Sequence, residues 1–437
     1  RMLEDSGVNI MGTKPDSIDF AEDRERFAAL LDRLQIMYPP AGQATSFEEA
    51  EAVAARIGYP LLVRPSYVLG GRGMMIAYDS EHLRTYMAEA TRISPDYPVY
   101  LDRFLEGAIE SDVDALCDGE EVYIGGVLEH IEEAGIHSGD SATCIPPFSF
   151  SDSLVERLRE TTRRIALALG VRGLVNVQYA IKGETIYVIE ANPRASRTVP
   201  FISKATGVPL AKCAARIMAG EKIADLHLPR DSRRLDWFCM KEAVMPWGRF
   251  PGAEVILGPE MKSTGEVMGI AKSYPEAYAK TQLAIDYDMP NPSKGKVFIS
   301  VCDRDKRHIL SVARILRYLG FDIVSTEGTA RVLRGGNVTC ETVNKIGGAH
   351  PNIGDMIANG EISLIINTPY GPGSRGDGYL LRTEAVRRGV TCVTALSGAN
   401  AYVSAIEAVR EERAGVGSNN EVGMSAIALQ DLPQYNV

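Results

Sequence analysis

Hydrophobic and polar residues recur along this chain with two periods, one typical of helices and one of strands. Apolar positions three and four residues apart predict helices in the first half, over 16–34, 47–57 and 154–169. Pro39 and Pro40 end the first helix, and Gly58 and Gly170 end the other two. Short apolar stretches between turn residues predict strands at 60–64, 99–104, 110–117, 121–129, 174–181 and 185–190.

The pattern restarts after a linker at 286–295, which contains two prolines together with Asn, Ser and Gly. Strands are predicted beyond it at 297–301, 321–325, 364–367 and 391–394, and helices at 308–319, 380–388 and 400–410. This alternation is typical of a small α/β domain with a doubly wound parallel sheet. We therefore expect a first domain of α/β and α+β character over 21–285 and a second over 296–437. Residues 1–20 resemble the tail of a preceding domain.

Composition narrows the function classes. The chain has 437 residues and a net charge of −10, from 47 basic and 57 acidic side chains. Such an acidic chain has no global electrostatic reason to bind nucleic acid or an anionic membrane. Its seven cysteines form no CxxC pair, which argues against a zinc site and favours a reducing cytoplasm. No signal-peptide pattern opens the chain, and no apolar run approaches the ~18 residues of a membrane helix.

One predicted hairpin carries candidate ligands for a cation. With a three-residue turn at 182–184, Gln178 would face position 188, and Glu190 would be its diagonal neighbour at roughly 7–8 Å. Asn192 follows on the same face. Oxygen ligands of these types suit Mg²⁺ or Mn²⁺ bridging nucleotide phosphates, and Arg194 could stabilise a transferring phosphoryl group. A hairpin whose polar face is simply solvated would show the same pattern.

Two loops add weaker signals. Three glycines and Arg72 at 70–73 follow a strand and could cradle an anion, although a tight hairpin is the simpler explanation. They match neither the Walker pattern nor the dinucleotide fingerprint. The segment 132–141 gathers Gly, Ser, acidic residues and His137 between strands, which is typical of a functional loop. Taken alone, His137 is more often structural than catalytic.

Together these segments resemble a known family. RPSYVLGG at 64–71, EAGIHSGDS at 133–141, EANPR at 190–194, PFISKATG at 200–207 and GEVMG at 265–269 resemble the second ATP-grasp domain of carbamoyl-phosphate synthase large chains. The resemblance implies an ATP-grasp fold over 21–285. It also implies that ATP phosphorylates carbamate to carbamoyl phosphate, which feeds pyrimidine and arginine biosynthesis. The segments before and after 233–239 match poorly.

The resemblance implies roles residue by residue. Gln178, Glu190 and Asn192 would bind Mg²⁺ or Mn²⁺, with K⁺ as a further candidate ion. Glu190, Asn192 and Arg194 would be catalytic. The residues expected to contact ATP are Arg24 and Arg64 at the phosphates, Arg103, Leu105 and Glu110 at the adenosine, Gly135, Ile136, His137 and Ser138 in a covering loop, and Gln178 and Glu190 beside the metal.

The second domain carries a candidate anion site. Two lysines and a pair of threonines fall near strand ends, where the carboxyl edge of a parallel sheet forms phosphate pockets. The residues are Lys306, Thr326, Thr329, Lys345 and Asn367. This domain resembles the methylglyoxal-synthase-like regulatory domain of the same family, which implies a nucleotide effector such as UMP. Pro369 stands where the family often has a second threonine. Simple solvation of the lysines is the alternative.

Other readings remain open. A biotin-carboxylase-like ligase would share the EANPR cluster but gives no reason for the second domain. A non-catalytic, nucleotide-sensing half is a further alternative. The family's first ATP-grasp half and its glutaminase subunit are not in this sequence, so both are expected partners, and pairing of the chain with itself is another hypothesis.

Overall fold

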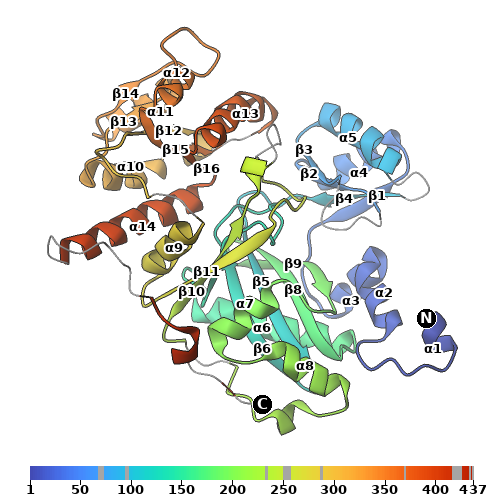
Figure 1. The fold of residues 1–437 in the computed structure, drawn as a ribbon. Helices are drawn as coiled ribbons and strands as arrows, with labels where there is room; N and C mark the ends of the chain where they lie inside the picture. Colours follow the sequence, from blue (N-terminus) through green and yellow to red (C-terminus); the bar gives the residue numbers. More distant parts are fainter. Residues whose placement is uncertain are drawn as a thin grey trace. The chain divides into compact units, whose positions relative to one another are not determined.

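The chain folds into two compact units (Figure 1). The computed structural model describes residues 1–66, 73–93, 98–231, 235–249, 257–285, 289–368, 371–415, 426–432 and 435. The first unit contains Arg1–Lys241, Ile270–Tyr274 and Ala426–Val437, and the second contains Glu242–Gly269 and Pro275–Ser425. The second unit thus reaches back beyond the expected linker at 286–295, of which 286–288 lie outside the described residues. The four predicted domain ranges stay predictions.

A four-stranded antiparallel sheet lies near the start of the first unit. Its strand order is β1 (Ala41–Ala44), β4 (Val99–Arg103), β2 (Leu61–Arg64) and β3 (Met75–Ala77). Two helices, α4 (Phe47–Ile57) and α5 (Ser80–Ile93), share a hydrophobic core with it. Ser46 caps α4 by accepting a hydrogen bond from the Glu49 amide, and Gly58, with φ 80°, ends it. The predicted helix over 47–57 is confirmed.

A seven-stranded sheet with order β11-β10-β7-β6-β5-β8-β9 is the largest element of the fold. Its strands in chain order are β5 (Ile109–Cys117), β6 (Val122–His130), β7 (Thr143–Ile145), β8 (Gly173–Lys182), β9 (Thr185–Asn192), β10 (Phe238–Val244) and β11 (Gly265–Ala271). Val113, Val175 and Val177 pack against α6 (Asp152–Ala168) in one core. Neighbouring residues of a strand face opposite ways. The polar residues next to these valines, Asp112 and Asp114 on β5 and Asn176 and Gln178 on β8, therefore lie on the other face.

The first unit also contains several shorter helices. They are α1 (Met2–Asp5), α2 (Pro15–Glu22), α3 (Arg24–Arg33), α7 (Thr198–Thr206), α8 (Leu210–Met218) and the 3₁₀ turns Ile223–Leu226 and Leu429–Asp431; α9 (Tyr274–Ala284) begins in this unit and continues into the second. Among the described residues, no helix combines the length and the apolar character needed to cross a bilayer.

The predicted single helix over 16–34 is wrong. The chain forms α2 and α3 instead, with Asp23 between them in an extended conformation. The Asp23 carboxylate accepts hydrogen bonds of 3.0 Å from the amides of Glu25 and Arg26. Asp23 therefore caps α3, and capping a new helix stabilises the break. The predicted helix over 154–169 is confirmed as α6, with Ser151 as its cap.

The second unit contains the predicted parallel sheet. Its order is β14 (Glu341–Thr342), β13 (Ile323–Ser325), β12 (Lys296–Val301), β15 (Ile362–Thr368) and β16 (Thr391–Val393), and every pair is parallel. The helices are α10 (Ile309–Tyr318), α11 (Glu327–Gly335), α12 (Ile353–Ala358), α13 (Gly371–Arg387) and α14 (Leu396–Gly415), with 3₁₀ turns at Trp247–Arg249 and Asp303–Asp305. The sequence pattern did not predict α11 or α12.

Candidate functional site

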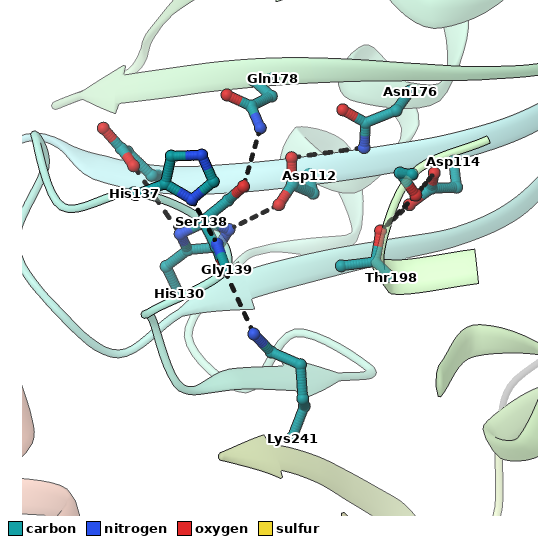
Figure 2. A network of polar contacts seen from close by, with 12 residues as sticks. Asp112, Asp114, His130, His137, Ser138, Gly139, Asn176, Gln178, Thr198 and Lys241 are labelled. Carbon is teal, nitrogen blue, oxygen red and sulfur yellow. Dashed lines mark hydrogen bonds and ion pairs between the residues drawn. The ribbon is translucent and has the colours of Figure 1, made fainter. Parts of the chain in front are cut away.

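Two rows of polar side chains cross strands β5, β8 and β9 of the seven-stranded sheet. The backbone register places the members of each row directly opposite one another. The rows are, in strand order, Asp112, Gln178 and Glu190, and Asp114, Asn176 and Asn192. Since positions two apart on a strand share a face, all six side chains lie on the face turned away from the α6 core. Figure 2 shows the β5 and β8 members side by side.

The register differs from the one expected. The turn between β8 and β9 holds two residues, with Lys182 opposite Thr185, and the pairing shifts by one residue between Gln178 and Tyr179. Val188 lies opposite Tyr179, so the prediction that Gln178 faces position 188 is wrong. The irregularity places Gln178 directly opposite Glu190, where side chains approach more closely than in a diagonal pair.

Short contacts connect the end of β9. Asn192 Nδ2 donates to Glu190 Oε1 at 2.9 Å, and Arg194 Nη2 donates to Asn192 Oδ1 at 3.1 Å. Arg64 Nη1 lies 3.9 Å from Glu190 Oε2. The Glu190 side chain is 37% exposed, so its carboxylate is open to a ligand. The structure thus brings together all four of these predicted site residues.

A pair of arginines shares one carboxylate beside this cluster. Arg24 Nη1 lies 2.6 Å from Asp102 Oδ1, whereas Arg64 Nε is 3.9 Å from Asp102 Oδ2. The buried Arg64 Nε makes no hydrogen bond in the described part of the chain. Burial and the charge of Arg24 lower the pKa of Arg64 from its ordinary value. An anionic ligand beside Arg64 would offset the repulsion between the two cations.

Glu110, His130 and Asp112 form a buried network next to the first row. His130 Nε2 lies 2.9 Å from Asp112 Oδ2, and His130 Nδ1 lies 3.7 Å from Glu110 Oε2. Burial raises the pKa of Glu110 to about 7, against the charge of His130. Burial also favours the neutral form of Asp112, but the hydrogen bond and charge of His130 keep the pKa of Asp112 below its ordinary value.

The loop at 132–141 is fastened to the polar face at several points (Figure 2). Glu110 Oε1 accepts from the Gly135 amide at 2.9 Å, and Gln178 Nε2 donates to Ser138 Oγ at 3.0 Å. The fully buried Lys241 on β10 donates its Nζ to the Ser138 carbonyl at 3.1 Å. The Gly139 amide donates to His137 Nδ1, and burial lowers the pKa of His137. The loop therefore lies directly over Gln178.

Two expected ATP contacts lie apart from these rows. Arg103 donates to the Tyr59 carbonyl, and it lines a cavity of about 540 Å³ together with Leu105. Within the described residues, the Arg103 side chain has no hydrogen bond to the polar rows on β8 and β9. Ile136 belongs to the covering loop. Residues 67–72, including Arg72, lie outside the described residues.

The donor atoms of the cluster suit a hard divalent cation. The described part of the chain has no group of three or more His, Cys, Asp or Glu placed to hold a metal. A metal here would therefore depend on the mixed set of Gln178, Glu190 and Asn192, which offers one carboxylate and two amide oxygens on one face. Oxygen-only sets of this kind fit Mg²⁺ or Mn²⁺, which complete their coordination with phosphate and water.

The second unit has a cavity of about 450 Å³ at the carboxyl edge of its parallel sheet. The five predicted effector residues all line it: Lys306, Thr326, Thr329, Lys345 and Asn367. Thr326 is the residue before α11, so the amides of the first helical turn open toward the cavity. A Cβ added at Gly328 would lie 3.5 Å from Lys306 Nζ, so this ammonium group sits beside that turn.

Several of these cavity residues are also held internally. Asn367 Nδ2 donates to the Ser300 carbonyl at 3.0 Å, and its Oδ1 accepts from Arg382 at 3.2 Å. Thr329 Oγ1 accepts from the Val301 amide at 3.2 Å. Lys306 is paired with the exposed Asp303. Among the described residues that line the cavity, Lys306 and Lys345 are those with a cationic side chain. Pro369 lies outside the described residues.

Comparison with known proteins places the chain in a family. A sequence profile described as "Carbamoyl-phosphate synthase L chain, ATP binding domain" matches residues 23–226, and an MGS-like domain profile matches 308–394. The carboxy-terminal section of the carbamoyl phosphate synthase large chain of Aquifex aeolicus (strain VF5) is 48% identical, over 100% of this chain and 82% of that protein. The chain belongs to the carbamoyl phosphate synthase large chain family.

Within this family the chain corresponds to the carboxy-terminal section. The large chain of Methanothermobacter thermautotrophicus is 54% identical over 96% of this chain, but this chain covers 39% of that protein. The chain thus spans about two fifths of the length of such longer relatives. It joins the family's ATP-binding domain to an MGS-like domain, and the predicted order of these two domains is confirmed.

A solved structure supports the fold of the first unit. The biotin carboxylase domain dimer of Hydrogenobacter thermophilus 2-oxoglutarate carboxylase, in complex with MgADP, ADP and bicarbonate, matches with a TM-score of 0.54. The identity is 21%, and the match covers 65% of this chain and 69% of that chain. At this identity the likeness shows the fold alone, an ATP-grasp fold, as predicted.

Proposed function

We propose that the first unit phosphorylates carbamate with ATP, as the carboxy-terminal section of a carbamoyl phosphate synthase large chain. The observation that carries the proposal is the opposition of Gln178 and Glu190, with Asn192, Arg194 and Arg64 around them. These groups lie within 23–226, the range matched by the family's ATP-binding domain. They supply oxygen ligands for a metal and positive charge for phosphate on the same face.

Each side chain has a distinct task in this proposal. Gln178, Glu190 and Asn192 hold a divalent cation, which when bound neutralises charge on the nucleotide phosphates. Arg64 and Arg24 bind phosphate oxygens in the ground state. Arg194 lies beside the transferring group, where it stabilises the charge that spreads over the phosphoryl oxygens.

The reaction itself needs little proton chemistry. A carboxylate oxygen of carbamate attacks the γ-phosphorus while the bond from that phosphorus to the bridging oxygen of ADP breaks, which gives carbamoyl phosphate and ADP. Because carbamate is already an anion, no general base has to deprotonate it. The loop held over Gln178 by Glu110 and Lys241 is suited to exclude water. Exclusion of water protects carbamate and strengthens the electrostatic interactions.

An ATPase assay with and without carbamate tests the proposal. We expect ADP formation to depend on carbamate, and the reverse reaction to make ATP from MgADP and carbamoyl phosphate. Turnover that depends on bicarbonate and biotin would favour a biotin-carboxylase-like ligase instead. Nucleotide binding without turnover in either direction would favour a non-catalytic, nucleotide-sensing half. The complete reaction requires the first half of the large chain and a glutaminase subunit, which we propose as partners in the cytoplasm.

A second function is favoured by the cavity in the second unit. We propose that a phosphorylated effector, a pyrimidine nucleotide such as UMP, binds between Lys306, Lys345 and the start of α11. Two ammonium groups and a helix amino terminus at one cavity favour a phosphate group. Nucleotide control at this position is consistent with a role in pyrimidine and arginine biosynthesis.

A further inference from the structure

Asp114 occupies the centre of the seven-stranded sheet and has no exposed surface. Both of its carboxylate oxygens accept hydrogen bonds of 2.5 Å, Oδ1 from Ser196 Oγ and Oδ2 from Thr198 Oγ1. The two hydroxyls are themselves 2.8 Å apart. Asp114 thus ties together two residues that are more than eighty positions away in the sequence, and Figure 2 shows its carboxylate turned toward Thr198.

The two hydroxyls belong to the corner that carries Arg194. The chain leaves β9 at Asn192, turns through 193–197 and enters α7 at Thr198. The Arg194 amide donates to the Asn192 carbonyl at 2.8 Å, and the Arg194 side chain bonds back to Asn192 Oδ1 and to the Ala195 carbonyl, both at 3.1 Å. These hydrogen bonds make the corner tight, and they fix the position of the Arg194 guanidinium relative to the backbone of the corner.

Both ends of the corner are fixed by the same row of the sheet. Asn192 at the entrance lies opposite Asn176, and Asn176 lies opposite Asp114, which holds Ser196 and Thr198 at the exit. Asn176 also donates to Asp112 at 3.4 Å, which links this row to the first one. A loop anchored at both ends to one rigid sheet has little freedom to shift its central side chain.

We propose that Asp114 is a positioning residue for phosphoryl transfer: by holding Ser196 and Thr198 it sets the position of Arg194 relative to the metal ligands on β8 and β9. The inference rests on the proposed function of the first unit. Asp114 does not touch the reacting atoms and acts through Arg194. A fully buried carboxylate is costly unless it is hydrogen-bonded. Here both oxygens of Asp114 accept from Ser196 and Thr198, so its burial is stable only while these two residues stay in position.

The hydroxyl of Thr198 offers a clean pair of variants. Thr198→Ser keeps the hydroxyl, whereas Thr198→Val keeps the shape and removes it. We expect Thr198→Val and Asp114→Asn to lower kcat of the reverse reaction by about ten- to a hundredfold, because small misplacements of a catalytic group have effects of this size. The KM for ADP should change less than about threefold, and Thr198→Ser should keep most of the activity. The control is Asp118→Asn in the turn after β5, which replaces a buried carboxylate that accepts from the backbone amides of Glu120, Glu121 and Ile223.

A double-mutant cycle separates positioning from general destabilisation. If Asp114 acts through Arg194, then Asp114→Asn combined with Arg194→Ala should be about as slow as Arg194→Ala alone. Additive losses, or wild-type kcat in a folded Asp114→Asn or Thr198→Val protein, would overturn the inference. Should Asp114→Asn fail to fold, the Thr198 pair and the cycle of Thr198→Val with Arg194→Ala still decide. If Arg194→Ala keeps the wild-type kcat, the positioning role is overturned, whereas absence of carbamate-dependent turnover in the wild-type protein would overturn the proposed function.

Discussion

Gln178 lies directly opposite Glu190 in the antiparallel pair of β8 and β9, and the pairing shifts by one residue between Gln178 and Tyr179, just before Glu190 on β9. In this arrangement the Gln178 amide nitrogen is occupied by Ser138, so its carbonyl oxygen is the atom left for a cation. Glu190 accepts from Asn192 through Oε1, while its Oε2 lies on the side of Arg64. The Glu190 carboxylate thus lies between the other two candidate metal ligands, Gln178 and Asn192, and the candidate phosphate-binding residue Arg64.

Replacement of this carboxylate should separate chemistry from folding. We expect Glu190→Gln to reduce phosphoryl transfer in both directions by at least ~10²-fold, because the predicted metal set has no other charged ligand. The side chain is 37% exposed, so the melting temperature should change by only a few degrees. Glu184→Gln, in the exposed turn of the same hairpin, is the control. Wild-type turnover of Glu190→Gln at saturating Mg²⁺ would end the metal assignment.

The two arginines beside Glu190 should give different kinetic signatures. Arg64→Ala should mainly raise the KM for ATP, because Arg64 binds phosphate in the ground state and the transition state alike. Arg194→Ala should lower kcat by ~10²-fold or more, because its charge matters most as the phosphoryl group transfers. Steady-state kinetics with varied ATP measure both effects. If both variants changed only the affinity for ATP, the role given to Arg194 would be wrong.

The buried carboxyl of Asp114 should make stability depend on pH. Burial and the nearby Asp112 raise the pKa of Asp114 from 3.8 to about 7, against the hydrogen bonds from Ser196 and Thr198. Between these values the folded state holds a proton that the unfolded chain has released, so the free energy of unfolding falls as pH rises. The contribution is complete below about pH 4 and is lost as pH passes about 7.

Urea unfolding between pH 5 and pH 8 measures this contribution. Asp114→Asn cannot titrate, so its unfolding free energy should fall less steeply with pH than that of the wild type. Asp16→Asn removes a largely exposed carboxylate and should leave the slope as it is. Equal slopes for the wild type and Asp114→Asn would mean that Asp114 ionises normally in the folded protein.

Side-chain alternation was enough to predict part of the site. Glu190 and Asn192 are two residues apart on one strand, so their common face follows from strand geometry alone. The pairing across the strands did not follow, because the length of the turn and the shift after Gln178 depend on local backbone geometry that residue types do not specify. Asp23 shows the same limit: apolar spacing continues through it, and only the capping contacts reveal that a new helix begins.

The side chains that the sequence pattern did not identify are those brought in from distant segments. Lys241 reaches Ser138 from β10, and His130 reaches Glu110 and Asp112 from the end of β6. Nothing in the spacing around either residue separates it from an ordinary strand residue. A buried charged residue in the middle of a strand is a usable signal only once its partners are known, because burial without a partner is costly.

The effector cavity gives the last prediction. UMP should bind the complete chain, with inorganic phosphate as a weaker probe of the same site. Lys306→Ala and Lys345→Ala should each weaken UMP binding by about ten- to a hundredfold, as expected for loss of a charge-assisted phosphate contact. Lys294→Ala, which removes a lysine outside the residues that line the cavity, is the control for the general loss of charge. Isothermal titration calorimetry measures all of these affinities.

If the site is regulatory, UMP and ATP must alter each other's affinity by the same factor, typically 5- to 150-fold, because coupling between two ligands is reciprocal. Titrations of each nucleotide with and without the other test this relation. Absence of heat with every nucleotide and with phosphate would remove the anion site, and Pro369→Thr, which supplies the hydroxyl common in the family, would then be the variant to examine.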